Sequence, residues 1–272
     1  MSKLNLILAI TLATLGLIAI NSMSSLPQTV YEVQQSVMVV SNSKTSGGSG
    51  VVISSTQETS TVLTNGHVCN LLANGGLVIS ADLSEHRVAN YRKSEQYDLC
   101  LIEVQENLHI NTAIAPTSPI VGERATVVGH PLLLPTMVTE GYFSYKLTIM
   151  VEVGSHPCTD FDKHTARGVW ICASNGGMMP DVKAFESIMT SALIEPGSSG
   201  SPVFNSRGEL AALIFAGDRN SPYSYAVPLE AIQFFLFSEV KLLSKTVPEN
   251  MLDASSIITN QNIDNQIKRI FK

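Results

Sequence analysis

Short runs of apolar residues, many of them β-branched, recur along most of the chain, with Gly, Pro, Asn and Ser between them. Segment 98–104 alternates apolar and polar residues, as a strand with one buried face does. The other runs are rich in Val, Ile and Thr, which is typical of strands. They lie at 37–40, 50–54, 61–64, 77–80, 125–129, 139–145, 146–153, 168–172, 209–215 and 223–227. About a dozen short strands predict an all-β protein built as a sandwich or as barrels.

The pattern changes near the end of the chain. Pro228 suits the first turn of a helix, and in the following segment, 229–245, the apolar residues recur near helical spacing. This spacing predicts one helix. Residues 246–272 are more polar, and we expect them to form a C-terminal tail. No low-complexity linker divides the chain.

The N-terminal apolar run, 4–20, holds no charged residue and is preceded by Lys3. A positive start followed by an apolar run is typical of a secretory signal. The run is also close to the roughly 20 residues that cross a bilayer as a helix. We therefore expect 1–25 to be a signal peptide or an N-terminal membrane anchor, with an ordinary buried helix as the third interpretation. In the first two cases the body is exported, secreted or periplasmic, and only this segment contacts the membrane.

Composition narrows the possible functions. Hydrophobic residues make up 44% of the chain and charged residues 15%, which is enough for a substantial core and argues against a disordered chain. The formal net charge is -6 and no Lys/Arg run occurs, so we expect no nucleic-acid partner. Four cysteines are too few for a disulfide scaffold. Cys158 and Cys172 lie close enough in sequence to close a short loop, whereas Cys69 and Cys100 could pair or remain buried thiols.

Three motifs carry candidate chemistry: TNGHVC at 64–69, DLCLI at 98–102 and PGSSGSP at 196–202. Each motif alone is more often structural, but together they supply a histidine, an aspartate and a serine beside expected strands. A serine hydroxyl needs a base to become nucleophilic, and imidazole titrates in the right range. A carboxylate behind the imidazole fixes its tautomer and stabilises the imidazolium. Glycines beside the serine let two backbone N–H groups face one point, as in an oxyanion hole.

The blocks TNGHVC, DLCLIEV and PGSSGSPVFNSRGELAAL resemble the three catalytic blocks of trypsin-like (chymotrypsin-fold) serine proteases, and most closely the HtrA/Deg branch. The connecting stretches GSGVVIS, VGERATVVGHP and TEGYFS also resemble that branch. The likeness covers roughly 47–145 and 187–235. It implies two perpendicular six-stranded antiparallel β-barrels, at about 30–120 and 121–235, in a protease domain spanning 30–245 with a C-terminal helix.

The resemblance also implies roles for individual residues. It makes His67 the general base, Asp98 the orienting carboxylate and Ser199 the nucleophile. The backbone N–H groups of Gly197 and Ser199 would form the oxyanion hole. An extended substrate would pair antiparallel along 213–217.

The same resemblance places the primary substrate pocket between 190–196 and 213–217. The candidate substrate-binding residues are Leu193, Phe215, Ala216 and Gly217. Leu193 stands where trypsin-type relatives have an acidic residue, so we expect a small or medium apolar P1 residue. Glu195 is the one acidic candidate for the pocket. The alternative interpretation is that it is a solvent-exposed charge on a loop.

Two residues depart from the family pattern. Ser201 follows Gly200 where the family usually has a second glycine, which bears on the geometry of the oxyanion loop. Ser198 stands where digestive relatives have an aspartate that pairs with a newly cleaved N-terminus. Ser198 cannot form that ion pair, so we expect no activation switch of that kind.

Segment 150–186 is longer than the usual family connection and holds several potential metal ligands. Their spacing matches no standard metal site, so we expect a disulfide-tied surface loop and neither a metal nor another cofactor. Many HtrA/Deg relatives carry a PDZ domain after the protease. The residues that follow the expected helix here are too few for one, so we expect a protease lacking a PDZ domain.

The leading hypothesis is an exported serine endopeptidase that cleaves unfolded or extended polypeptides through an acyl-enzyme. The alternative is a catalytically weak protease-fold binding or scaffold protein, suggested by Ser201 and the long insertion. An esterase or transferase that uses the same triad is the third possibility. An α/β-hydrolase is disfavoured, because its motif lies between a strand and a helix and its triad has the order Ser, Asp, His.

Overall fold

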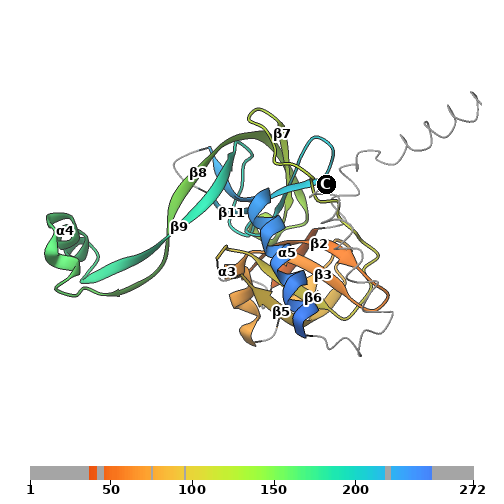
Figure 1. Ribbon diagram of the computed structural model, residues 1–272, viewed down its shortest axis with the longest axis horizontal. Coiled ribbons are helices and arrows are strands. Elements are labelled where there is room, and N and C mark those ends of the chain that lie inside the picture. The colour runs from red at the N-terminus through yellow and green to blue at the C-terminus, as the bar shows by residue number, and fades with distance from the viewer. Residues whose placement is uncertain (1–36, 42–45, 75, 95, 218–221, 247–272) are drawn as a thin grey trace, which may run out of the picture.

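The computed structural model describes residues 37–41, 46–74, 76–94, 96–217 and 222–246 (Figure 1). The predicted signal or anchor at 1–25 lies outside the described residues, as does the predicted tail apart from its first residue. Within the described ranges, no helix combines the length and the apolar character that crossing a bilayer requires.

The first barrel consists of six antiparallel strands that close on themselves. Strand β4 pairs with β5 on one side and returns to β1 on the other, where Val40 lies opposite Val78. In spatial order the strands are β1 (Val37–Ser41), β2 (Gly47–Ser55), β3 (Ser60–Thr64), β6 (Cys100–Val104), β5 (Glu85–Lys93) and β4 (Leu77–Ile79). Between β3 and β4 lie two short helical segments, α3 (Gly66–Cys69) and η1 (Asn70–Asn74).

The second barrel is also closed and six-stranded. A third short helical segment, η2 (Pro131–Leu133), connects the two strands of this barrel that come first in the sequence, β7 and β8. In spatial order its strands are β10 (Pro202–Phe204), β11 (Leu210–Gly217), β12 (Ser224–Pro228), β9 (Met178–Thr190), β8 (Met137–Pro157) and β7 (Arg124–Gly129). Helix α5 (Leu229–Thr246) follows β12 directly. The predicted all-β architecture of two six-stranded barrels and a C-terminal helix is confirmed.

One apolar cluster joins the two barrels and α5. It includes Leu63 from the first barrel, Leu213 from the second, and Ile232 and Phe235 from α5, all of which are buried. Burial of apolar surface is the main stabilising contribution to such a core. The cluster therefore holds the two barrels and the helix together, and with them the segments that each barrel contributes to the site.

The structure differs from the predicted elements in several places. The apolar run 168–172, predicted as a strand, lies in helix α4 (Ala166–Ser174), where the Thr165 side chain caps the helix by accepting the N–H of Gly168. A short apolar run fits either state, and here the cap and its tertiary contacts favour the helix. The predicted strands 139–145 and 146–153 are one continuous strand, β8. Strands β5, β9 and β10 were not among the predicted strands.

The second halves of β8 and β9 form a two-stranded arm. Their pairing continues from Phe143 opposite Thr190 to Pro157 opposite Met178, and Figure 1 shows the resulting ribbon projecting from the body. At its far end lie the 3-10 turn η3 (Asp162–His164) and α4. A disulfide between Cys158 and Cys172 joins the end of the ribbon to α4.

Candidate active site

His67 and Asp98 are brought together by the pairing of β3 with β6. Thr64, the last residue of β3, lies opposite Cys100, the first residue of β6. The helix α3, which carries His67, begins just after Thr64, and Asp98 lies just before Cys100. The backbone N–H of His67 donates to Asp98 Oδ1 at 2.9 Å, and His67 Nδ1 lies 2.7 Å from Asp98 Oδ2. The side chain of His67 is 47% exposed and that of Asp98 14% exposed. The carboxylate is therefore sheltered, while the imidazole remains accessible from the cleft.

A disulfide joins Cys69 to Cys100. Each cysteine lies two residues after a predicted catalytic residue, Cys69 after His67 and Cys100 after Asp98. The disulfide thus links the two segments that carry the histidine and the aspartate. Of the two possibilities that the sequence left open for these cysteines, the structure has the pair rather than buried thiols.

Ser199 lies in a tight turn between the two barrels. Gly197 and Gly200 flank it with φ angles of 95° and 85°, a region that favours glycine. A Cβ atom on Gly200 would lie 1.9 Å from the carbonyl oxygen of Ser49, so the packing also requires a glycine there. The carbonyl of Ser199 accepts the N–H of Ser49 at 2.7 Å, and the N–H of Gly200 donates to Ile214 at 2.8 Å.

The hydrogen bonds of the turn leave two N–H groups available. The N–H groups of Ser198, Gly200 and Ser201 are all bonded to backbone carbonyls. Within the part of the chain that the structure describes, those of Gly197 and Ser199 donate to no acceptor. Two unpaired N–H groups, one of the serine itself and one two residues before it, can stabilise a negatively charged oxygen, which is the chemistry of an oxyanion hole.

The buried residue Ser49 supports this turn, and sequence reasoning missed it. Its hydroxyl donates to the carbonyl of Gly197 at 2.9 Å and accepts the N–H of His130, also at 2.9 Å. Its own carbonyl accepts the hydroxyl of Thr64 at 2.7 Å. Ser49 therefore connects β2, the end of β3, the turn before Ser199 and the segment after β7.

Segment 130–134 braces the turn from the other side. Leu132 N–H donates to the carbonyl of Pro196 at 2.6 Å. Leu132 and its neighbour Leu133 have φ angles of 54° and 57°, an uncommon conformation for non-glycine residues. Such strained residues tend to occur at functional sites, where the surrounding structure holds them in place.

The Ser201 side chain is accommodated behind the turn. Ser201 is fully buried, and a Cβ atom on Gly129 would lie 1.9 Å from its hydroxyl oxygen. The missing side chain of Gly129 therefore provides the space that the Ser201 side chain occupies. Among the described residues the hydroxyl of Ser201 has no hydrogen-bond partner.

Ser199 borders a pocket of about 560 Å³. Three of the four predicted substrate-binding residues line it, namely Leu193, Ala216 and Gly217, and Glu195 also lies in its lining. The remaining lining residues are Ala192, Ile194, Pro196, Pro222 and Tyr223. Apolar side chains therefore predominate, and Glu195 is the only acidic residue among them.

The fourth predicted residue, Phe215, lies elsewhere. It is buried and lines a neighbouring hollow of about 590 Å³ together with His67 and Asp98. Phe215 is followed in β11 by Ala216, which lines the Ser199 pocket. No hydrogen bond joins the side chains of Ser199 and His67 within the described residues. In unliganded enzymes such hydrogen bonds are often long and shorten only when substrate binds.

The base of the arm also contributes to the site. Four of its residues, Val151, Glu152, Lys183 and Phe185, line the hollow that contains His67. The Phe185 ring lies 5.8 Å from that of Phe215, and Lys183 Nζ lies 5.3 Å from the centre of the Phe185 ring. The sequence marked this segment as an insertion, but no local signal indicated that its base lies beside His67.

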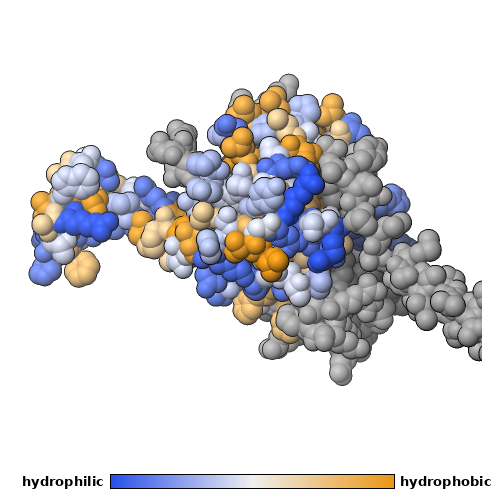
Figure 2. Space-filling model, turned by 90° about the horizontal axis from the view of Figure 1, so that it is seen from above, coloured by the Kyte–Doolittle hydropathy of each residue, from blue (hydrophilic) through white to orange (hydrophobic). Residues whose placement is uncertain are grey.

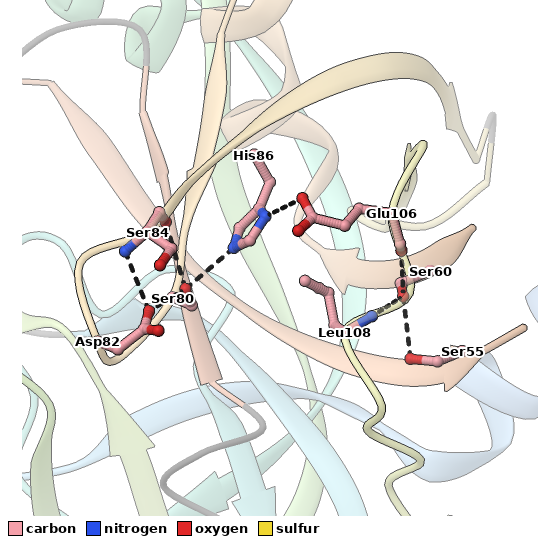
Figure 3. Close-up of polar contacts among 8 residues, drawn as sticks. All are labelled: Ser55, Ser60, Ser80, Asp82, Ser84, His86, Glu106 and Leu108. Atoms are coloured by element: carbon pink, nitrogen blue, oxygen red, sulfur yellow. Dashed lines mark hydrogen bonds and ion pairs between the residues drawn. The ribbon is translucent and has the colours of Figure 1, made fainter. Parts of the chain in front are cut away.

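A second serine, histidine and carboxylate lie in line in the first barrel (Figure 3). The buried His86 is within 2.6 Å of Glu106 Oε2 through Nδ1 and within 3.0 Å of Ser80 Oγ through Nε2. The Ser80 hydroxyl also donates to Asp82 Oδ1 at 2.6 Å, which lowers the pKa of Asp82 to about 2. This hydroxyl is therefore held by the turn between β4 and β5. We interpret this cluster as structural.

The fold and the site thus define a two-barrel protein with the layout of a trypsin-like serine protease. Comparison with known proteins agrees, because residues 48–213 match the trypsin-like peptidase domain family. The matched segment is more than half of the chain, and the chain belongs to this family. The predicted resemblance is confirmed.

One relative and two solved structures illustrate the similarity. The chain is 28% identical over 191 residues to HhoB of Synechocystis sp., which carries the name of a serine protease; the match covers 68% of this chain and 38% of that relative. The active form of the Rv3671c protease from M. tuberculosis has a TM-score of 0.58 at 17% identity, covering 79% of this chain and 87% of that one. The serine endoprotease from Yersinia pestis has a TM-score of 0.55 at 20% identity, covering 78% and 66%. At these identities the structures establish the shared fold.

Proposed function

We propose that this protein is a serine endopeptidase that uses His67, Asp98 and Ser199 as a catalytic triad. The observation that carries the proposal is the 2.7 Å contact between His67 Nδ1 and Asp98 Oδ2, in a family member whose serine turn leaves two N–H groups unpaired. With Nδ1–H directed to the carboxylate, Nε2 is the basic nitrogen available to the serine.

In the proposed reaction Ser199 Oγ attacks the carbonyl carbon of the peptide bond while its proton passes to His67 Nε2. The N–H groups of Gly197 and Ser199 stabilise the oxyanion that forms. His67 then protonates the leaving amine, which releases the first product and leaves an acyl-enzyme. Water attacks this ester with His67 again as the base, the second product departs, and Ser199 recovers its proton.

The substrate is proposed to be an extended or unfolded polypeptide. The pairing of β10 with β11 ends at Leu213, so the edge of β11 at 215–217 is not covered by that strand. An extended peptide can add to such an edge through backbone hydrogen bonds. The apolar lining of the Ser199 pocket, to which Leu193 and Ala216 contribute, supports a preference for apolar P1 residues.

We further propose that the protein works outside the cytoplasm, either released or anchored by residues 4–20. Both of its cysteine pairs, Cys69–Cys100 and Cys158–Cys172, are joined as disulfides. Disulfides persist in secreted and periplasmic proteins and are rare in the reducing cytosol. This supports export.

Labelling with a fluorophosphonate probe, which reacts with activated serines, tests the proposal. We expect labelling of the full chain, its loss in Ser199→Ala, and its retention in Ser206→Ala, a control at an exposed serine outside the turn. Persistent labelling of Ser199→Ala would exclude Ser199 as the nucleophile. A folded protein that does not label at all would favour the binding or scaffold alternative.

A further inference from the structure

The tip of the arm carries an apolar stripe that faces solvent. Ala166, Val169, Trp170 and Ala173 follow the i, i+3, i+4, i+7 spacing of one helix face, and all four are exposed. The exposed fractions are 49% for Val169 and 69% for Trp170. Helices of globular proteins normally turn such a stripe toward the core. Here all four residues face solvent instead.

The opposite face of α4 is the one that is attached to the arm. Gly168 and Cys172 are the buried residues of this helix, and Cys172 is linked to Cys158 at the end of the ribbon. A Cβ atom on Gly168 would lie 1.8 Å from the carbonyl oxygen of Asp162, so α4 packs directly on the preceding turn. The orientation of the stripe is therefore fixed by covalent and packing contacts.

More apolar surface lies beside the stripe. Phe161, immediately before η3, is 87% exposed. Figure 2 shows hydrophobic residues beside strongly hydrophilic ones at the far end of the arm, which the ribbon separates from the body. The two largest apolar groups of the tip, Phe161 and Trp170, are thus presented to solvent at the point of the described structure that projects furthest (Figure 1).

We propose that this tip docks on the surface of a lipid bilayer. Tryptophan is enriched at the interface between membrane and water, because its ring is apolar and its N–H remains hydrogen-bonded. Lys163 in η3 and Arg167 in α4 are both exposed and can pair with lipid phosphates. Asp160 and Asp162 balance these two charges, so insertion of the apolar side chains, rather than net charge, provides the attraction.

The size of the stripe favours a bilayer over a protein partner. A helix of nine residues is only about 14 Å long. A stable protein interface buries about 800 Å² on each side and involves roughly 20–30 residues. The tip offers far fewer residues than that, whereas shallow insertion into a bilayer requires only a small apolar surface.

The predicted N-terminal anchor would supply a second membrane contact on the same chain. Residues 4–20 form the uncharged apolar run, and residues 21–36 separate it from β1. If 4–20 is retained as an anchor, the tip adds a second attachment to the same bilayer. The tip would then orient the catalytic body relative to the membrane.

The experiment uses the fluorescence of Trp170, the only tryptophan in the chain. The full chain is mixed with phosphatidylcholine vesicles whose acyl chains carry bromine, a short-range quencher of tryptophan. We expect quenching and a shift of the emission to shorter wavelength. Because the reporter lies on α4, binding through residues 4–20 alone does not produce this signal.

Variants that keep the reporter identify the docking surface. Phe161→Glu combined with Val169→Glu places charge on the tip, and we expect at least a ten-fold loss of quenching at limiting lipid. Met150→Glu, at an exposed position on the ribbon, is the matched control and is expected to retain quenching. Cleavage of a soluble peptide by each variant checks that the protein folds.

Two results would overturn the proposal. The first is a chain that sediments with vesicles while Trp170 is not quenched, or is quenched equally in the double variant. The second is a blue shift of Trp170 that appears without vesicles and grows with protein concentration, which would assign the stripe to contact between copies of the chain.

Discussion

Replacing Ser49 by alanine is expected to impair catalysis, although the Ser49 hydroxyl contacts no side chain of the proposed triad. The Ser49 hydroxyl makes two buried hydrogen bonds, one to the carbonyl of Gly197 and one from the N–H of His130. The alanine variant keeps the backbone contact from the Ser49 N–H to Ser199. It removes only the hydroxyl that holds the peptide group after Gly197.

The structure suggests the size of the effect. Leaving a buried polar group without its partner costs about 1–3 kcal/mol, and Ser49→Ala affects two such groups. If the turn relaxes and the Gly197 N–H moves away from the oxyanion, the loss approaches that of one oxyanion-hole donor, about 10²–10³ in kcat. Ser49 lies outside the proposed substrate-binding edge of β11, so we expect KM to change little.

Steady-state kinetics on a peptide substrate provide the assay. The matched control is Ser54→Ala, a buried serine on the same strand whose hydroxyl makes no hydrogen bond among the described residues. We expect kcat to fall in Ser49→Ala and to remain near the wild-type value in Ser54→Ala. A folded Ser49→Ala variant with unchanged kcat would refute the proposed role of Ser49 in holding the oxyanion hole.

Three further predictions concern other parts of the molecule. Replacing Cys69 and Cys100 by alanine opens a loop with a sequence separation of 31. It is expected to lower the free energy of unfolding in urea by about 3–4 kcal/mol, and an unchanged midpoint would contradict this. A hydrogen bond to Asp181 raises the pKa of His156 above its ordinary value of 6.5. The stability that this His156–Asp181 contact contributes is therefore fully present below pH 6.5. It is lost as the pH rises through the raised pKa of His156. NMR titration should show a lower His156 pKa in Asp181→Asn, whereas equal values would exclude this cause. Peptides with apolar P1 residues should be cleaved faster than those with Lys or Arg, and a preference for Lys that Glu195→Gln removes would reverse the proposed specificity.

Local patterns in the sequence predicted much of the fold. The alternating segment 98–104 became β6, and the apolar residues at helical spacing after Pro228 became α5. In both cases the signal lies within a few consecutive residues. Strand β5 gave no such signal because it is exposed at most positions. Residues 168–172 were wrongly predicted as a strand because five apolar residues fit a strand as well as a helix.

In the candidate site, too, residues in short motifs could be predicted, whereas residues placed by long-range contacts could not. His67, Asp98 and Ser199 lie in sequence blocks that can be read one at a time, and the family resemblance related them to one another. Ser49 could not be found in this way, because the groups that its hydroxyl contacts are 148 and 81 residues away in sequence. The base of the arm reaches the hollow beside His67 only because β8 and β9 continue beyond the barrel. Such contacts depend on topology, which no short motif encodes.

Digestion of unfolded casein by the full chain, followed over time by mass spectrometry, addresses proteolysis itself. We expect internal cleavage by the wild type and none by Ser199→Ala, with cleavage sites that mostly follow small or medium apolar residues. Cleavage by Ser199→Ala at the wild-type rate would contradict the proposed mechanism. Intact casein, in the presence of a folded wild-type chain that also fails to react with the fluorophosphonate probe, would contradict the assignment as a peptidase.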